Sequence, residues 1–181
     1  MVDPGVEDKR MLVIEAEFAR TLDTIARDGN TLSSVIREAW DSGTLNVLTK
    51  NNSATSTNAH ISVIGHITVE ELLKKLSATE TANGFGNRFL WIYVTRSKLL
   101  PFGGQLSEDA LDPIASRLRN AKLFAERCGQ IRFDNEAAKL WCEVYPKLSE
   151  GAKGLVGKMT SRSEAHAFRL ATLYAVLDLS G

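Results

Sequence analysis

A chain of 181 residues is long enough for one hydrophobic core, or for one domain with a small appendage. Its 22 basic and 22 acidic residues cancel, which excludes a general basic field for nucleic acid but allows a local basic site. Two cysteines outside any CxxC spacing form no disulfide framework, and no apolar run reaches membrane-spanning length. We therefore expect a soluble protein of the reducing cytoplasm.

The first predicted elements are a strand and two helices. Residues 11–14 are a compact apolar run, which is typical of a strand, and two acids follow at Glu15 and Glu17. A helix over about residues 17–27 carries apolar side chains on one face. A second helix over about residues 31–41 ends at a serine-glycine pair.

The next stretch predicts a hairpin and a capped helix. Residues 45–49 are typical of a strand, and a polar tip joins them to an extended stretch that ends in AHISVIGHIT, residues 59–68. Thr68 and Glu71 have the spacing of a capping box, which predicts a helix from there to about residue 79.

A glycine-rich turn then precedes an apolar run. Gly84 and Gly86 permit backbone angles that other residues avoid. Residues 89–94 are apolar on both faces, which predicts a central, fully buried strand. Arg88 lies between the two, either as half of a structural ion pair or as a cation directed at an anion. The local pattern alone favours the ion pair.

The second half of the chain is mainly helical, with a short strand or extended link at residues 130–133. Interleaved strands and helices followed by helices predict an α/β core with a helical second part. Because the last predicted helix stops at the final residues and the first strand begins almost at once, we expect a fragment of a longer protein, and a small natural domain is the alternative. The predicted helices cover residues 107–128, 134–145 and 163–179, and Asp134 is the predicted cap of the second.

Acids at the end of an apolar strand are one candidate site. In nucleotide-hydrolysing α/β proteins a buried strand delivers carboxylates to a metal and a water, and Glu15 and Glu17 have this position. The alternative is that they stabilise a helix N-terminus, and the pattern alone favours that alternative.

Histidines form a second candidate. His66 ends a strand immediately before a helix, where an open α/β sheet faces its ligand crevice, although a hydrogen bond to backbone is an equal alternative. His60 lies six residues earlier, about 20 Å away at strand rise, so the two histidines predict no zinc site.

A polar hairpin tip is the third candidate. Lys50, Asn51 and Asn52 carry an ammonium and amide donors that suit nucleic-acid phosphates, and the alternative is a solvated turn. No GxxxxGK[ST] phosphate loop occurs in the sequence. Gly151–Lys158 is rich in glycine and lysine, but its spacing is wrong and it follows a predicted helix.

Two motifs resemble the ATPase part of phage- and plasmid-type DNA primase-helicases. They are GFGNRFL, residues 84–90, and HISVIGHIT, residues 60–68. The resemblance covers about residues 10–105 and continues more loosely through SRSEAHAFRLATLYAVLDLSG, residues 161–181. It implies a partial RecA-like core over residues 1–105 and a helical appendage over residues 106–181.

The resemblance also implies roles for the candidate residues. Glu15 and Glu17 would belong to the acidic strand of the ATPase site, His66 to a polar sensor position, and Arg88 to an arginine finger reaching a neighbour's nucleotide. The implied partners are ATP and Mg²⁺ in the full-length parent, single-stranded DNA, and further copies of the parent in a ring.

One departure from the family is large, because the phosphate loop and any primase part are missing. We therefore expect this chain alone to bind no cofactor and to hydrolyse little or no ATP. A non-catalytic assembly or DNA-docking module of the same fold is the rival interpretation.

Overall fold

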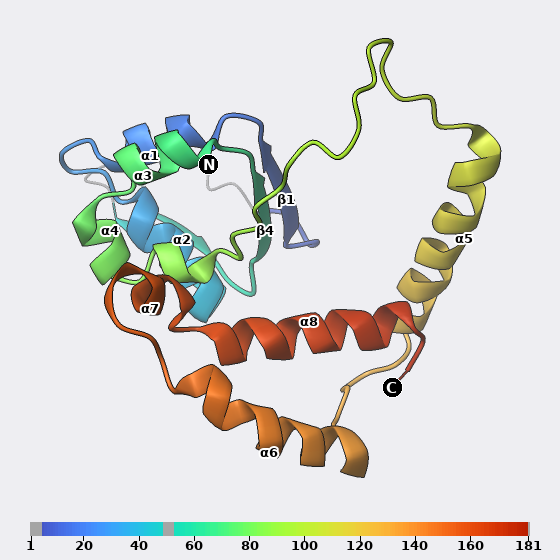
Figure 1. Ribbon diagram of the computed structural model, residues 1–181. Coiled ribbons are helices and arrows are strands. Elements are labelled where there is room, and N and C mark those ends of the chain that lie inside the picture. The colour runs from blue at the N-terminus through green and yellow to red at the C-terminus, as the bar shows by residue number, and fades with distance from the viewer. Residues whose placement is uncertain (1–4, 49–52, 181) are drawn as a thin grey trace. The chain divides into compact units, whose positions relative to one another are not determined.

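The computed structural model describes residues 5–48 and 53–180, which form two units (Figure 1). The first unit comprises Met1–Phe89 and Lys153–Met159, and the second comprises Leu90–Ala152 and Thr160–Gly181. Within these described ranges, no helix is long and apolar enough to cross a membrane.

The first unit contains a two-stranded parallel sheet of β1 (Arg10–Glu15) and β4 (His60–Gly65). The register runs from Arg10 opposite His60 to Glu15 opposite Gly65. This confirms the predicted strand at residues 11–14. It corrects the predicted hairpin, because residues 60–65 pair with β1 instead of with the strand that precedes them.

A separate antiparallel hairpin does form earlier in the chain. It pairs β2 (Leu45–Leu48) with β3 (Ser53–Ser56). The sequence pattern predicted a hairpin here but assigned its second strand too far along the chain. Apolar periodicity predicts where strands occur but not which strands pair.

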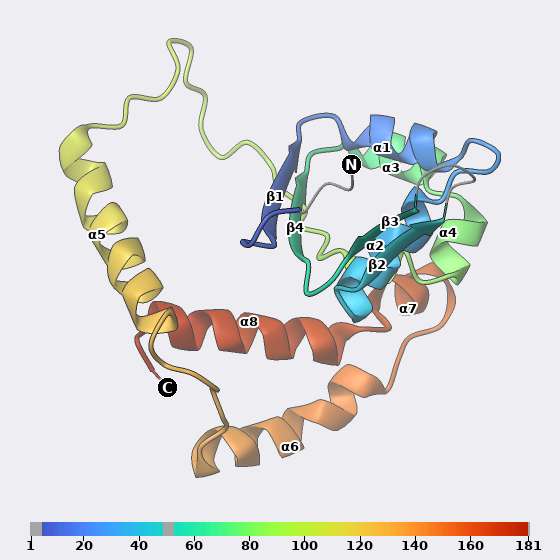
Figure 2. The ribbon, with the colours of Figure 1, turned by 180° about the vertical axis from the view of Figure 1, so that it is seen from behind.

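Helices cover one side of the parallel pair. α1 (Phe18–Ile25), α2 (Leu32–Asp41) and α3 (Val69–Lys75) all lie on the same side of β1 and β4 (Figures 1 and 2). The core on that side includes Phe18, Ala19 and Leu22, each 2% exposed.

The predicted helix start at Thr68 is confirmed. The Thr68 hydroxyl accepts a hydrogen bond from the Glu71 backbone N–H at 3.2 Å, which satisfies one of the open donors at the helix start. α3 ends earlier than predicted, and a second capped helix, α4 (Ala78–Ala82), follows it.

The opposite face of the parallel pair is open. Leu12, Ile14 and Ile64 share this face and are 58%, 65% and 48% exposed. The side chain of Phe18 packs against Gly65 on the covered face, where a Cβ on Gly65 would lie 2.7 Å from the ring. The fold is therefore mixed α/β with a small open sheet.

The predicted buried strand at residues 89–94 is wrong. Gly86–Arg88 form a short 3-10 helix, η1, and residues 90–107 contain no helix or strand. Ile92, Tyr93 and Val94 are between 72% and 79% exposed. A strand exists only through hydrogen bonds to a neighbour, and among the described residues no strand pairs with this segment.

The second unit consists of three longer helices, α5 (Glu108–Ala125), α6 (Asn135–Ser149) and α8 (Ser163–Leu177), with α8 packed against both others. The Asp134 carboxylate caps α6 by accepting from the Ala137 N–H at 2.7 Å, as the sequence predicts. Residues 130–133 form no strand. A cluster of aromatic rings joins α6, α8 and the link before α6, and its members are Phe133, Trp141, Tyr145 and Phe168.

Candidate functional site

Three predicted residues meet at the carboxyl edge of the parallel pair. Glu15 ends β1 opposite Gly65, and His66 directly follows β4. The His66 N–H donates to the Glu15 carbonyl at 3.0 Å, and the His66 carbonyl accepts from the Phe18 N–H at 2.8 Å. The turn from β1 into α1, which contains Glu17, is thereby fixed beside the end of β4.

The two carboxylates at this edge differ in their surroundings. Glu15 is half-buried, and one of its carboxylate oxygens accepts a hydrogen bond from the Glu17 N–H at 3.3 Å. Glu17 precedes α1, but its side chain makes no capping hydrogen bond there. Glu17 and His66 are exposed. The edge therefore offers one oriented carboxylate and two side chains open to a ligand.

Among the described residues, no three histidine, cysteine, aspartate or glutamate side chains cluster in a way that could hold a metal ion. Carboxylate oxygens suit Mg²⁺, which commonly takes one or two carboxylates and completes its shell with water and substrate phosphates. The edge fits that mode of binding, in which the substrate brings most of the ligands.

Arg88, which the resemblance implies as a finger reaching a neighbour's nucleotide, does not stand free in the structure. Its side chain is 7% exposed, and its Nη2 forms an ion pair with the Asp41 carboxylate at 2.5 Å. Its Nη1 donates to the Gly84 carbonyl at 2.6 Å. The guanidinium is thus buried against an acid of its own chain, which is the structural ion pair that the local pattern favoured.

Local chemistry explains this arrangement. Asp41 is the last residue of α2, whose final turn holds no basic residue, so the carboxylate faces the negative end of the helix dipole. The Arg88 cation offsets the unfavourable interaction between the Asp41 carboxylate and this end of the helix. Gly84 has φ +82°, and a Cβ there would lie 2.9 Å from Arg88 Nη1. Glycine at this position supplies both the left-handed turn and the space for the guanidinium.

His60 and the hairpin tip complete the set of predicted residues. Lys50, Asn51 and Asn52 lie outside the described residues. His60 begins β4, at the opposite end of the strand from His66. Local sequence patterns contain no signal for Asp41, because its partner lies 47 residues further along the chain.

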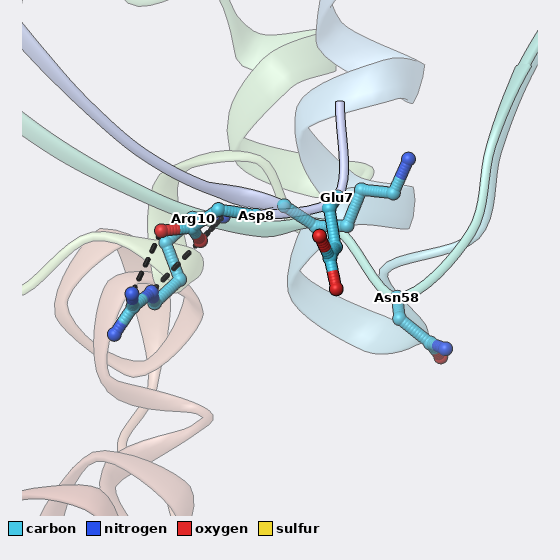
Figure 3. A pocket seen from close by; sticks show the side chains of 5 residues that line it. Glu7, Asp8, Arg10 and Asn58 are labelled. Carbon is cyan, nitrogen blue, oxygen red and sulfur yellow. Dashed lines mark hydrogen bonds and ion pairs between the residues drawn. The ribbon is translucent and has the colours of Figure 1, made fainter. Parts of the chain in front are cut away.

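A shallow hollow opens at the amino end of β1 (Figure 3). The Arg10 guanidinium donates to both Asp8 carboxylate oxygens, at 2.8 Å and 2.7 Å. These hydrogen bonds hold the pKa of the Asp8 carboxyl well below its usual range. Both side chains are exposed, so the pair is a surface ion pair and the hollow has no enclosed ligand space. The hollow is lined by Glu7, Asp8, Lys9, Arg10 and Asn58.

Comparison with known proteins adds no assignment. No family model, no curated protein and no solved structure matches this chain.

Proposed function

We propose that the chain is the C-terminal part of the RecA-like ATPase module of a DNA primase-helicase. In this proposal it contributes an acidic strand and a polar sensor position. The observation that carries the proposal is the meeting of Glu15 and His66 at the carboxyl ends of two hydrogen-bonded parallel strands. Open α/β sheets bind their ligands in the crevice outside these strand ends.

Each residue has a definite task in this proposal. The Glu15 carboxylate, oriented by the Glu17 N–H, positions the attacking water or a substrate-bound Mg²⁺. His66 lies one residue beyond β4 and contacts the departing phosphate. A phosphate loop has to come from another segment, because GxxxxGK[ST] is absent from the sequence.

The open sheet also supports the proposal. Parallel strands occur almost only in larger sheets with both faces covered. Leu12, Ile14 and Ile64 remain exposed on one face of β1 and β4, which is the face that further elements of a complete ATPase core would cover. In this proposal the parent assembles into a ring and moves along single-stranded DNA, with Lys50, Asn51 and Asn52 as candidate phosphate contacts.

Steady-state phosphate release by the full-length parent, with single-stranded DNA present, tests the proposal. Glu15→Gln is expected to lower kcat by about 10²–10⁴-fold, since it removes a positioned base. The matched control is Glu70→Gln, on an exposed position of α3, which should retain turnover. Undiminished turnover in Glu15→Gln would contradict the proposed role of this edge.

A non-catalytic assembly or DNA-docking module is the second candidate. The pairing of Arg88 with Asp41 favours it, because a buried, neutralised guanidinium cannot reach a neighbour's nucleotide. Titration with a fluorescent ATP analogue separates the two functions. This chain alone should bind none under either function, whereas a polypeptide extended at its N-terminus should bind only if the ATPase proposal holds.

A further inference from the structure

Arg88 belongs to a segment that is tied to α2 at two points. We call residues 78–88, which comprise α4 and η1, the arginine segment. At its start the Ser33 hydroxyl donates to the Glu80 carboxylate, and at its end Arg88 pairs with Asp41. The two contacts are eight residues apart on both elements, which corresponds to about 12 Å along α2. The arginine segment therefore runs alongside α2 and is attached at both ends.

A third contact comes from α7 (Gly154–Thr160), far along the chain. Gly86 faces Met159, and a Cβ on Gly86 would lie 2.7 Å from the Met159 sulfur. In both views α7 lies beside the arginine segment (Figures 1 and 2). Met159 thus packs on the same short 3-10 helix that carries Arg88, and only a residue without a side chain permits so close a contact.

α7 is intrinsically a weak helix. It has only seven residues, and two of them, Gly154 and Gly157, are glycines with poor helix propensity. Isolated helices of this length are not stable in water, so α7 exists through its docking. Leu155 and Val156 are 53% and 65% exposed, whereas Gly157 is buried and Met159 is half-buried. Such segments open locally at small cost.

The chain path gives this docking a consequence. The arginine segment leads into the second unit after Phe89, and α7 begins just after the chain returns at Lys153. Residues 90–152 therefore connect the two segments that meet at the Gly86–Met159 contact, and a rearrangement of these residues can pull on either segment.

We propose that α7 is a conformational latch that keeps the Arg88–Asp41 pair closed, and that undocking of α7 releases the Arg88 guanidinium to solvent. The freed group would then be available to a phosphate or carboxylate, the anions that a guanidinium binds best. This inference concerns the exposure of one arginine and does not depend on the proposed ATPase function.

The rate at which phenylglyoxal modifies Arg88, measured by peptide mass spectrometry on the full chain, tests the latch. Met159→Ala removes the side chain that packs on Gly86 and should accelerate modification by about tenfold, which corresponds to about 1.4 kcal/mol of lost docking energy. Asp41→Asn, which removes the counter-ion directly, should accelerate it at least as much. The matched control is Met11→Ala, which truncates an exposed methionine of β1 and should change nothing.

Amide exchange of β1 and β4, measured on the same variants, separates local opening from global unfolding. Exchange in these strands should stay at the wild-type rate in Met159→Ala, while exchange in residues 84–89 rises. The latch is refuted if Met159→Ala leaves Arg88 modification unchanged, or if β1 and β4 open together with Arg88. It is equally refuted if Asp41→Asn fails to expose Arg88.

A double variant adds a geometric check. Gly86→Ala should also accelerate modification, by about two- to fivefold, because the flexible methionine can move aside at modest cost. In the Met159→Ala background the same change should have little further effect, since the side chain it displaces is gone. Fully additive effects would show that Gly86 and Met159 act separately and would contradict the latch.

Discussion

Removing Arg88 alone and removing Asp41 alone should lower the free energy of unfolding by different amounts. The Arg88 side chain is 7% exposed, whereas that of Asp41 is 46% exposed. Asp41→Ala leaves a buried cation without its counter-ion. Arg88→Met leaves a carboxylate that water can reach, and methionine retains most of the apolar stem. Because an uncompensated buried charge costs more than an exposed one, Asp41→Ala should be the more destabilising change.

The loss in free energy of unfolding for each substitution can be estimated from the contacts that it removes. Arg88→Met loses a half-exposed ion pair, worth about 0.5–1 kcal/mol, and the hydrogen bond to the Gly84 carbonyl, worth about 1 kcal/mol. Removal of the buried Arg88 Nε, which has no hydrogen-bond partner in the described part of the chain, offsets some of this loss. We expect a net cost of about 1 kcal/mol. For Asp41→Ala we expect about 2–3 kcal/mol, below the range for a fully buried pair because one side of this pair is open to water.

Urea unfolding monitored by Trp40 fluorescence measures both costs. Trp40 precedes Asp41 in α2, and Trp91→Phe with Trp141→Phe removes the two other tryptophans, so the signal reports the first unit alone. Asp8→Ala, which breaks an exposed ion pair, is the control and should not shift the midpoint. The reasoning is refuted if Arg88→Met destabilises the unit as much as Asp41→Ala does.

Three further substitutions test other parts of the first unit. Gly65→Ala should destabilise it by about 1–3 kcal/mol in thermal unfolding, because the added Cβ would meet the Phe18 ring. The control is Gly104→Ala, which should be neutral because the nearest neighbour of its Cβ would lie at 3.9 Å. Thr68→Ala should cost about 1 kcal/mol through loss of the α3 cap, and an unchanged urea midpoint would contradict that role. Lys50→Ala in the parent should lower the salt slope of single-strand binding by somewhat less than one unit if the hairpin tip contacts phosphate, and should leave it unchanged if the tip is a solvated turn.

Features that depend on neighbouring residues were predictable from the sequence. The Thr68 cap, the Asp134 cap and the β1 strand each depend on residues within one turn or one strand of each other. The placing of Glu15 at a strand end followed from the same local pattern. The two caps form because a hydroxyl or carboxylate at the helix start accepts from a nearby backbone N–H that has no partner within the helix.

Features that depend on distant partners were not predictable. The pairing of β4 with β1 joins residues 50 positions apart, and the Arg88–Asp41 pair joins residues 47 positions apart. Periodicity shows that a segment is apolar but not which segment it meets. Residues 89–94 have the composition of a buried strand, yet composition cannot supply the neighbour that a strand requires.

The glycines around Arg88 show how one short motif serves contacts of different kinds. Gly84 allows the left-handed turn and the approach of the guanidinium to its own carbonyl, whereas Gly86 allows the approach of Met159. A substitution at the first glycine should therefore strain the backbone and expel Arg88 directly, while one at the second should act on Arg88 only by displacing α7. Arg88 is held by its own turn and by α2, and the 3-10 helix that carries it contacts α7. These contacts give Arg88 a structural role. The Arg88 guanidinium could bind an anionic ligand only after these contacts open.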